Sequence, residues 1–149
     1  MDIEQVIEKF GRFRTRAFVV DGYSQNSAYR NDERIITNKM FYLDYYRIFP
    51  NLIEIQPRNE FAISCNPDFV YIMNCTEFKD RNEDYIWESD RIKDDSGIIW
   101  TIVYQHGKYF VKTRNLPPAH AVRTLFDLAK DFNLEIVGNF WQDQENEQK

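Results

Sequence analysis

Short apolar segments separated by turn residues follow one another along the middle of this 149-residue chain, and this succession constrains the fold more than any other feature. Segments of this length whose apolar residues alternate or run together predict β-strands. Asp95-Ser96-Gly97 and His106-Gly107 are turn signals between the last three segments, which therefore predict a three-stranded meander. The predicted strands of this stretch cover residues 51–57, 60–65, 68–73, 84–92, 97–105 and 108–115.

Helical patterns are fewer and lie toward the two ends of the chain. Residues 2–10 carry apolar side chains at helical spacing and predict a short amphipathic helix. Pro117-Pro118 suits the start of a longer helix, whose apolar stripe runs to Phe132. Residues 33–49 are ambiguous, because their apolar spacing favours a helix whereas Asn38-Lys39 could turn a hairpin between two β-rich runs.

Together these patterns predict an α+β fold in a single domain. We expect a mostly antiparallel sheet of six or seven strands with two or three helices packed on one side. The domain should cover residues 1–141, because a chain of this length forms one hydrophobic core without needing a metal or a disulfide. Residues 142–149 form a polar tail that we expect to fray.

Charge and cysteine content narrow the class of protein. The net charge of −5 disfavours a protein that coats nucleic acid through general attraction. The charge is uneven: residues 80–95 carry −4 and residues 106–130 carry +4. Cys65 and Cys75 have no metal-ligand spacing, and no apolar run is long enough to cross a membrane, so we expect a cytoplasmic protein with reduced thiols.

Two features are candidate contacts for a partner. Arg12, Arg14 and Arg16 alternate along a predicted strand over residues 12–20 and would project from one face of it. Arginine is the preferred cation for recognition of carboxylates and phosphates, although the same row could pair with the acids of the chain itself. Trp141 stands just before the polar tail and is the second candidate.

The segment from Pro67 to Lys79 resembles the active-site motif of the PD-(D/E)xK nucleases, with Asp68, Glu77 and Lys79 in the motif's order. The resemblance implies that Asp68 and Glu77 are ligands of Mg²⁺ and that Lys79 is the catalytic cation. Geometry sets a condition on this hypothesis. One continuous strand would hold the two carboxylates about 30 Å apart, so a shared metal requires the chain to reverse near Met73-Asn74.

These observations favour a non-catalytic, cytoplasmic protein-binding module. We expect it to engage a macromolecular partner, most readily another protein, through a charged and aromatic sheet face. Small acidic α+β proteins without a catalytic constellation often serve as inhibitors, as immunity proteins or in phage anti-defence, which is an association at the level of class. The alternatives are the metal-dependent nuclease and a phage or other structural assembly component. No cofactor is expected outside the nuclease alternative.

Overall fold

The computed structural model describes residues 13–25 and 35–147, the last three of them by their backbone alone. The chain divides into two compact units, Met1–Asn74 and Cys75–Lys149. Each unit contains its own cluster of buried apolar residues. The single domain expected over residues 1–141 stays a prediction, which one cooperative unfolding transition would bear out.

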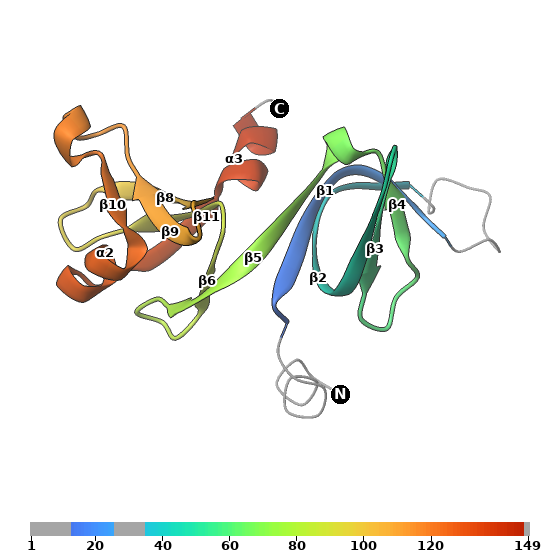
Figure 1. The fold of residues 1–149 in the computed structure, drawn as a ribbon, viewed down its shortest axis with the longest axis horizontal. Helices are drawn as coiled ribbons and strands as arrows, with labels where there is room; N and C mark the ends of the chain where they lie inside the picture. Colours follow the sequence, from blue (N-terminus) through green and yellow to red (C-terminus); the bar gives the residue numbers. More distant parts are fainter. Residues whose placement is uncertain (1–12, 26–34, 148–149) are drawn as a thin grey trace. The chain divides into compact units, whose positions relative to one another are not determined.

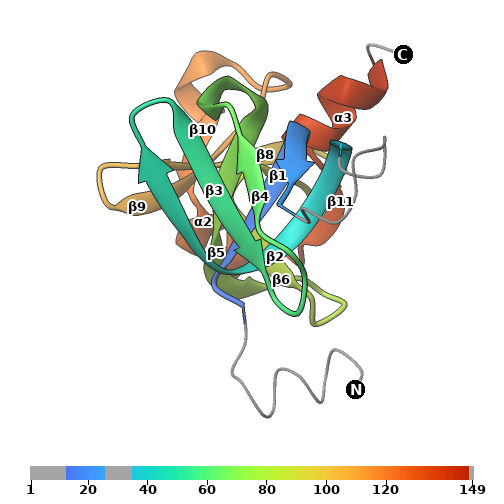
Figure 2. The ribbon, with the colours of Figure 1, turned by 90° about the vertical axis from the view of Figure 1, so that its right-hand side faces the viewer.

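Four strands of the first unit close into a small barrel (Figures 1 and 2). They are β1 (Thr15–Ser24), β2 (Ile35–Phe49), β3 (Leu52–Pro57) and β4 (Ile63–Cys65). Each strand pairs antiparallel with the next, and β4 returns to β1 through the pairs Tyr23–Ser64 and Ser24–Ile63. Closure pairs the two ends of the sheet with each other, which protects strand edges from other chains.

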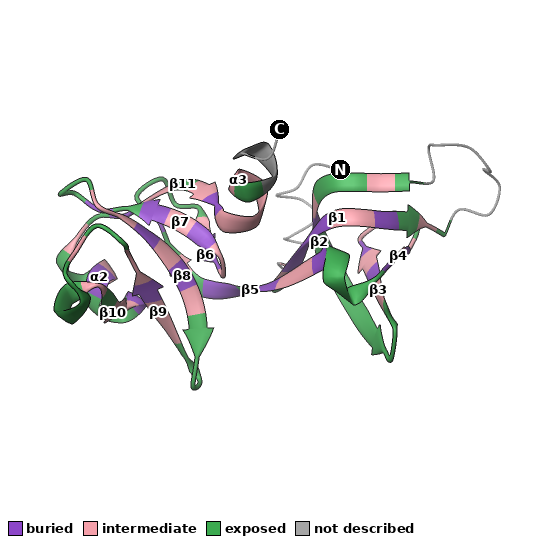
Figure 3. Ribbon diagram, turned by 90° about the horizontal axis from the view of Figure 1, so that it is seen from above, coloured by how far each residue is buried: buried purple, intermediate pink, exposed green. Residues whose placement is uncertain are grey.

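The barrel closes because β2 is long enough to serve two neighbours. Its first part pairs with β1 as far as Leu43, and beyond a bulge at Asp44 its second part pairs with β3. A bulge bends a strand and increases its twist. Alternation along β2 places Phe41 and Leu43 in the core, whereas the part beyond the bulge is exposed, with Ile48 exposed to 70% (Figure 3).

Two outer strands, β5 (Val70–Lys79) and β6 (Tyr85–Trp87), extend this sheet. The 3-10 turn η2 (Pro67–Phe69) leads into β5, which pairs with β1 in its first half and with β6 in its second half. The border between the two units falls within β5. Near the end of β5 a bulge interrupts the pairing, and Glu77 there has a left-handed φ of 73°.

The second unit is a five-stranded antiparallel sheet in the order β10-β9-β8-β7-β11. One face of this sheet carries Trp100, Ile102 and Val111, which pack against Leu125 and Leu128 of helix α2. Figure 3 shows the resulting alternation of buried and less buried residues along β8. The elements are β7 (Asp90–Lys93), β8 (Ile99–Gln105), β9 (Lys108–Lys112), η3 (Pro118–His120), β10 (Val122–Thr124), α2 (Leu125–Asp131), β11 (Glu135–Asn139) and α3 (Phe140–Glu147).

The structure corrects the predicted α+β class. The fold is mostly β, with a barrel, two outer strands and a second sheet in place of one sheet covered by helices, and the described residues contain only two short helices. Residues 33–49 account for most of the error, since the described part of this segment, from Ile35, is one strand. Neither the favoured helix nor the hairpin at Asn38-Lys39 forms, and the segment expected as a helix over residues 2–10 lies outside the described residues.

The long helix predicted after Pro117-Pro118 is also shorter than expected. It begins at Leu125, where the Thr124 hydroxyl accepts a hydrogen bond from the N–H of Asp127 at 3.2 Å. A threonine in this position satisfies one of the N–H groups that a helix start leaves without a partner. The preceding residues form η3 and the short strand β10, and the segment expected as a frayed tail lies largely in α3.

A buried aspartate closes the turn between β7 and β8. Asp94 Oδ1 accepts hydrogen bonds from the N–H of Ser96 (2.9 Å), the hydroxyl of Ser96 (2.6 Å) and the N–H of Ile98 (3.1 Å), and Oδ2 accepts one from the indole N–H of Trp100 (3.0 Å). Burial by itself would raise the pKa of Asp94, but these hydrogen bonds outweigh it and hold the pKa below its ordinary value. The side chain therefore holds the turn that joins β7 to β8.

Candidate functional site

The predicted arginine row is not an exposed row of three. Arg12 lies outside the described residues, and Arg14 is exposed just before β1 begins. Arg16 is buried, with 8% of its surface exposed, at a position paired with Tyr42 on one side and Met73 on the other. Of the two arginines of this row that the structure describes, Arg14 is exposed and Arg16 is buried. Arg14 is therefore the one open to a partner, and its role in binding stays a prediction.

Trp141, the other predicted contact residue, lies half-buried in α3. Its indole N–H donates a hydrogen bond to the hydroxyl of Ser89 at 3.0 Å, and its ring meets Phe140 edge-on with the ring centroids 4.9 Å apart. The side chain thus has an anchoring role in the second unit, which the sequence did not suggest. Its contact with a partner stays a prediction.

The geometric condition set for the nuclease motif is not met. β5 continues through Met73 and Asn74 as one strand, so the chain does not reverse there. Asp68 lies in η2, ahead of the strand, and Lys79 Nζ lies 3.8 Å from Glu83 Oε2. Within residues 13–25 and 35–147, no group of three or more His, Cys, Asp and Glu side chains is placed to hold a metal ion. The motif therefore carries no proposal.

A different set of side chains meets on the open face of the second sheet, opposite α2. The pairs Gly138–Arg91, Arg91–Thr101, Thr101–Lys112 and Lys112–Val122 join all five strands in register. Residues paired in this way point to the same face, so the five form one row across the sheet. Arg91 and Lys112 lie two strands apart, which corresponds to about 10 Å between their backbones. We call these five residues the basic row.

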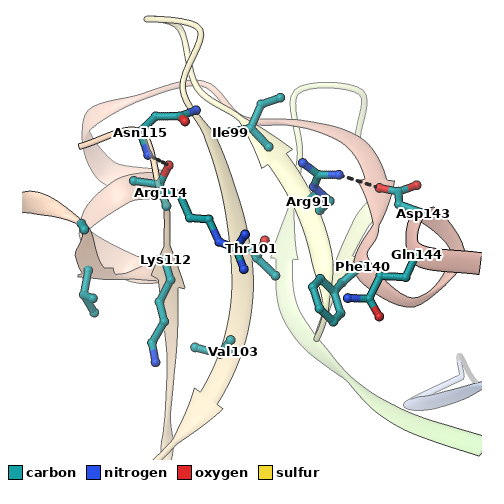
Figure 4. Close-up of a pocket in the computed structure, with 13 residues that line it drawn as sticks. Arg91, Ile99, Thr101, Val103, Lys112, Arg114, Asn115, Phe140, Asp143 and Gln144 are labelled. Carbon is teal, nitrogen blue, oxygen red and sulfur yellow. Dashed lines mark hydrogen bonds and ion pairs between the residues drawn. The ribbon is translucent and has the colours of Figure 1, made fainter. Parts of the chain in front are cut away.

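The basic row crosses a groove of about 640 Å³ (Figure 4). Ile99 and Val103 of β8 lie on either side of Thr101 and provide an apolar floor, and Phe140 of α3 provides part of a wall. Arg114, two residues beyond Lys112 along the chain, adds a third cation. A groove of this size with an apolar floor and a few placed charges is typical of a ligand or peptide site.

Of the three cations in the groove, only Arg91 forms an ion pair with a described side chain. Arg91 Nη1 lies 3.2 Å from Asp143 Oδ2 of α3. A dashed line marks this ion pair in Figure 4. Among the ion pairs that described side chains form, none includes Lys112 or Arg114. The groove therefore keeps a positive charge although the whole chain carries −5. Such a local excess attracts an anionic group and orients it.

Part of this site could be predicted from the sequence. The sequence showed the excess of bases over residues 106–130, and the strand predicted over residues 108–115 contains Lys112 and Arg114. The sequence did not connect them with Arg91, which lies on another strand, because strand order is set by pairing and not by sequence distance. The row could have been found only by aligning the predicted meander in register.

Comparison of the chain with protein-family models and with curated proteins gave no match. No helix among the described residues is long and apolar enough to cross a bilayer.

Cys65 is buried in the barrel core, where burial, with a smaller contribution from Asp21, raises the pKa of its thiol to about 11. A thiol with this pKa stays protonated at neutral pH and is a poor nucleophile. The groove remains the surface with the clearest chemical character.

Proposed function

We propose that this protein is a non-catalytic binding module that holds an extended acidic segment of a partner protein in the groove of the second sheet. The observation that carries the proposal is the basic row, in which Arg91 and Lys112 flank Thr101 above an apolar floor, with Arg114 beside them. Carboxylates of the partner would pair with the cations. Apolar side chains between those carboxylates would lie on Ile99 and Val103.

A protein partner fits this groove better than a nucleic acid does. Double-stranded DNA carries one negative charge per roughly 1.7 Å and is bound through many phosphate contacts, which a chain of net charge −5 opposes. The groove offers few cations and a floor of aliphatic side chains, which suit carboxylates separated by apolar residues. In the first unit, the exposed Tyr45, Ile48 and Phe49 of β2 also belong to residue types that are common in protein interfaces.

This proposal belongs to the class expected from composition, that of inhibitors, immunity proteins and anti-defence proteins acting in the cytoplasm. Such proteins often act by occupying a charged surface of another macromolecule, and an acidic partner segment would be that surface here. The alternative of a structural assembly component differs in stoichiometry. A large oligomer of defined size in light scattering would favour it.

Fluorescence anisotropy with a labelled peptide of alternating glutamate and leucine tests the proposed function. We expect saturable binding that weakens about tenfold between low and physiological salt, since exposed charges are screened beyond roughly 8 Å at the higher salt. A peptide of alternating lysine and leucine serves as the matched control and should not bind. Equal binding of both peptides, or tighter binding of single-stranded DNA, would contradict an acidic protein partner.

A further inference from the structure

The Gly138 position of the basic row has no side chain of its own, and a carboxylate from elsewhere in the chain fills it. A Cβ atom placed on Gly138 would lie 2.5 Å from Asp143 Oδ2 and 3.0 Å from Oδ1. Real Cβ atoms do not approach other atoms so closely. The missing side chain of Gly138 is therefore what allows Asp143 to lie over the sheet and reach Arg91.

The start of α3 holds Asp143 in this place. Asn139 Oδ1 accepts hydrogen bonds from the N–H of Trp141 at 3.1 Å and of Gln142 at 3.4 Å. The indole of Trp141 is bonded to Ser89, and the amide of Asn139 donates to Asp90 Oδ1 at 3.3 Å. These contacts fix the first turn of α3 on the sheet. The carboxylate of Asp143, which follows Gln142, therefore lies against Arg91.

We propose that Asp143 takes the place of one partner carboxylate in the unbound protein, so that α3 competes with the acidic segment for Arg91. This inference rests on the proposed function. Lys112 and Arg114 receive the first carboxylates of the segment, because neither forms an ion pair with a described side chain. A further carboxylate reaches Arg91 only by displacing Asp143, which sets a threshold against weakly acidic segments.

Asp143→Asn and Gly138→Ala test this competition with the glutamate–leucine peptide. The first removes the competing charge, and the second places a methyl group where the carboxylate lies. An exposed ion pair contributes about 0.2–1 kcal/mol, so each variant should bind the peptide about 1.4- to fivefold more tightly than the wild type. Asp127→Asn makes the same change of net charge in α2, outside the groove, and should leave the affinity unchanged.

A double-mutant cycle with Arg91→Gln separates competition from a merely structural effect. In the wild type, Arg91→Gln should weaken binding of the peptide less than it does in the Asp143→Asn background, because binding at Arg91 of the wild type first requires the displacement of Asp143. In the Asp143→Asn background the same substitution should remove the whole gain in affinity. If the peptide binds but Asp143→Asn fails to tighten it, the inference is overturned while the proposed function stands. If no variant binds the peptide, the proposed function is wrong and the inference is wrong with it.

Discussion

Replacing Asp94 by alanine should lower the free energy of unfolding by about 3 kcal/mol, the cost of leaving buried donors without an acceptor. The carboxylate accepts hydrogen bonds from Ser96, Ile98 and Trp100, and 4% of Asp94 is exposed. The indole N–H of Trp100 would lose its partner in a site that water reaches poorly, since Trp100 is 2% exposed. Denaturant unfolding at neutral pH measures the loss.

The pH dependence gives this prediction a second readout. Because the folded-state pKa of Asp94 is lowered, its contribution to stability is complete above the ordinary pKa, about 3.9, and is lost as the pH falls through the lower folded value. The stability difference between the wild type and Asp94→Asn should therefore shrink in acid. Asp84→Ala, an exposed aspartate in the turn before β6, is the control and should cost little. A loss as small for Asp94→Ala as for this control would contradict the assigned role.

The double charge reversal Lys112→Glu with Arg114→Glu should have the largest effect on binding. It replaces two cations of the groove by anions, so the acidic segment would meet repulsion where it met attraction. We expect a loss of affinity for the glutamate–leucine peptide of at least about a hundredfold, or about 2.7 kcal/mol. The melting temperature should stay nearly unchanged, because neither residue belongs to the core cluster of the second unit.

Lys130→Glu is the control for this loss. Lys130 is exposed in the last turn of α2, on the other side of the sheet from the groove. The substitution changes the net charge in the same direction, so it measures the effect of overall charge alone. The contrary result is that Lys130→Glu lowers the affinity for the peptide as much, per unit of charge changed, as the groove variants do. In that case the peptide is attracted by the overall charge of the protein, and the groove is not its binding site.

The sequence was most informative where turn chemistry and alternation agreed. The two reversals that join β7, β8 and β9 were predicted correctly, because Asp95-Ser96-Gly97 and His106-Gly107 mark them and both segments are turns in the structure. The first strand of the predicted meander, residues 84–92, was wrong: a turn at residues 88–89 divides it into β6 and β7, and β6 pairs with β5. Gly107 has a φ of 80° and His106 one of 51°, as a two-residue hairpin turn requires. Local chemistry sufficed here, because the neighbours in sequence are also neighbours in the sheet.

β2 shows why local chemistry was insufficient elsewhere. Met40 and Leu43 happen to stand at helical spacing, but the period-two alternation of Phe41, Tyr42 and Leu43 decides which side chains are buried. Pairing of β2 with both β1 and β3 stabilises this extended form. The residues of β2 alone do not indicate which strands will pair with it. Barrel closure, which corrected the fold class, is likewise a property of long-range pairing.

The candidate site followed the same division. The sequence predicted a charged sheet face as the means of binding, but it selected the row near Arg14, where Arg16 proves to be buried. The groove depends on Arg91, Lys112 and Asp143, which belong to three separate elements. Their convergence follows from strand order and from the absence of a side chain at Gly138, neither of which a spacing rule can predict.

The most direct test of an acid-binding groove is to locate the bound peptide by amide chemical shifts. The ¹⁵N-labelled protein is titrated with the glutamate–leucine peptide, and the lysine–leucine peptide serves as the reference. We expect the largest changes in amide chemical shift at Arg91, Thr101 and Lys112. Smaller changes are expected at Asp143, because the peptide breaks its ion pair with Arg91. Shifts centred on β1 near Arg14, with the basic row unmoved, would contradict the account.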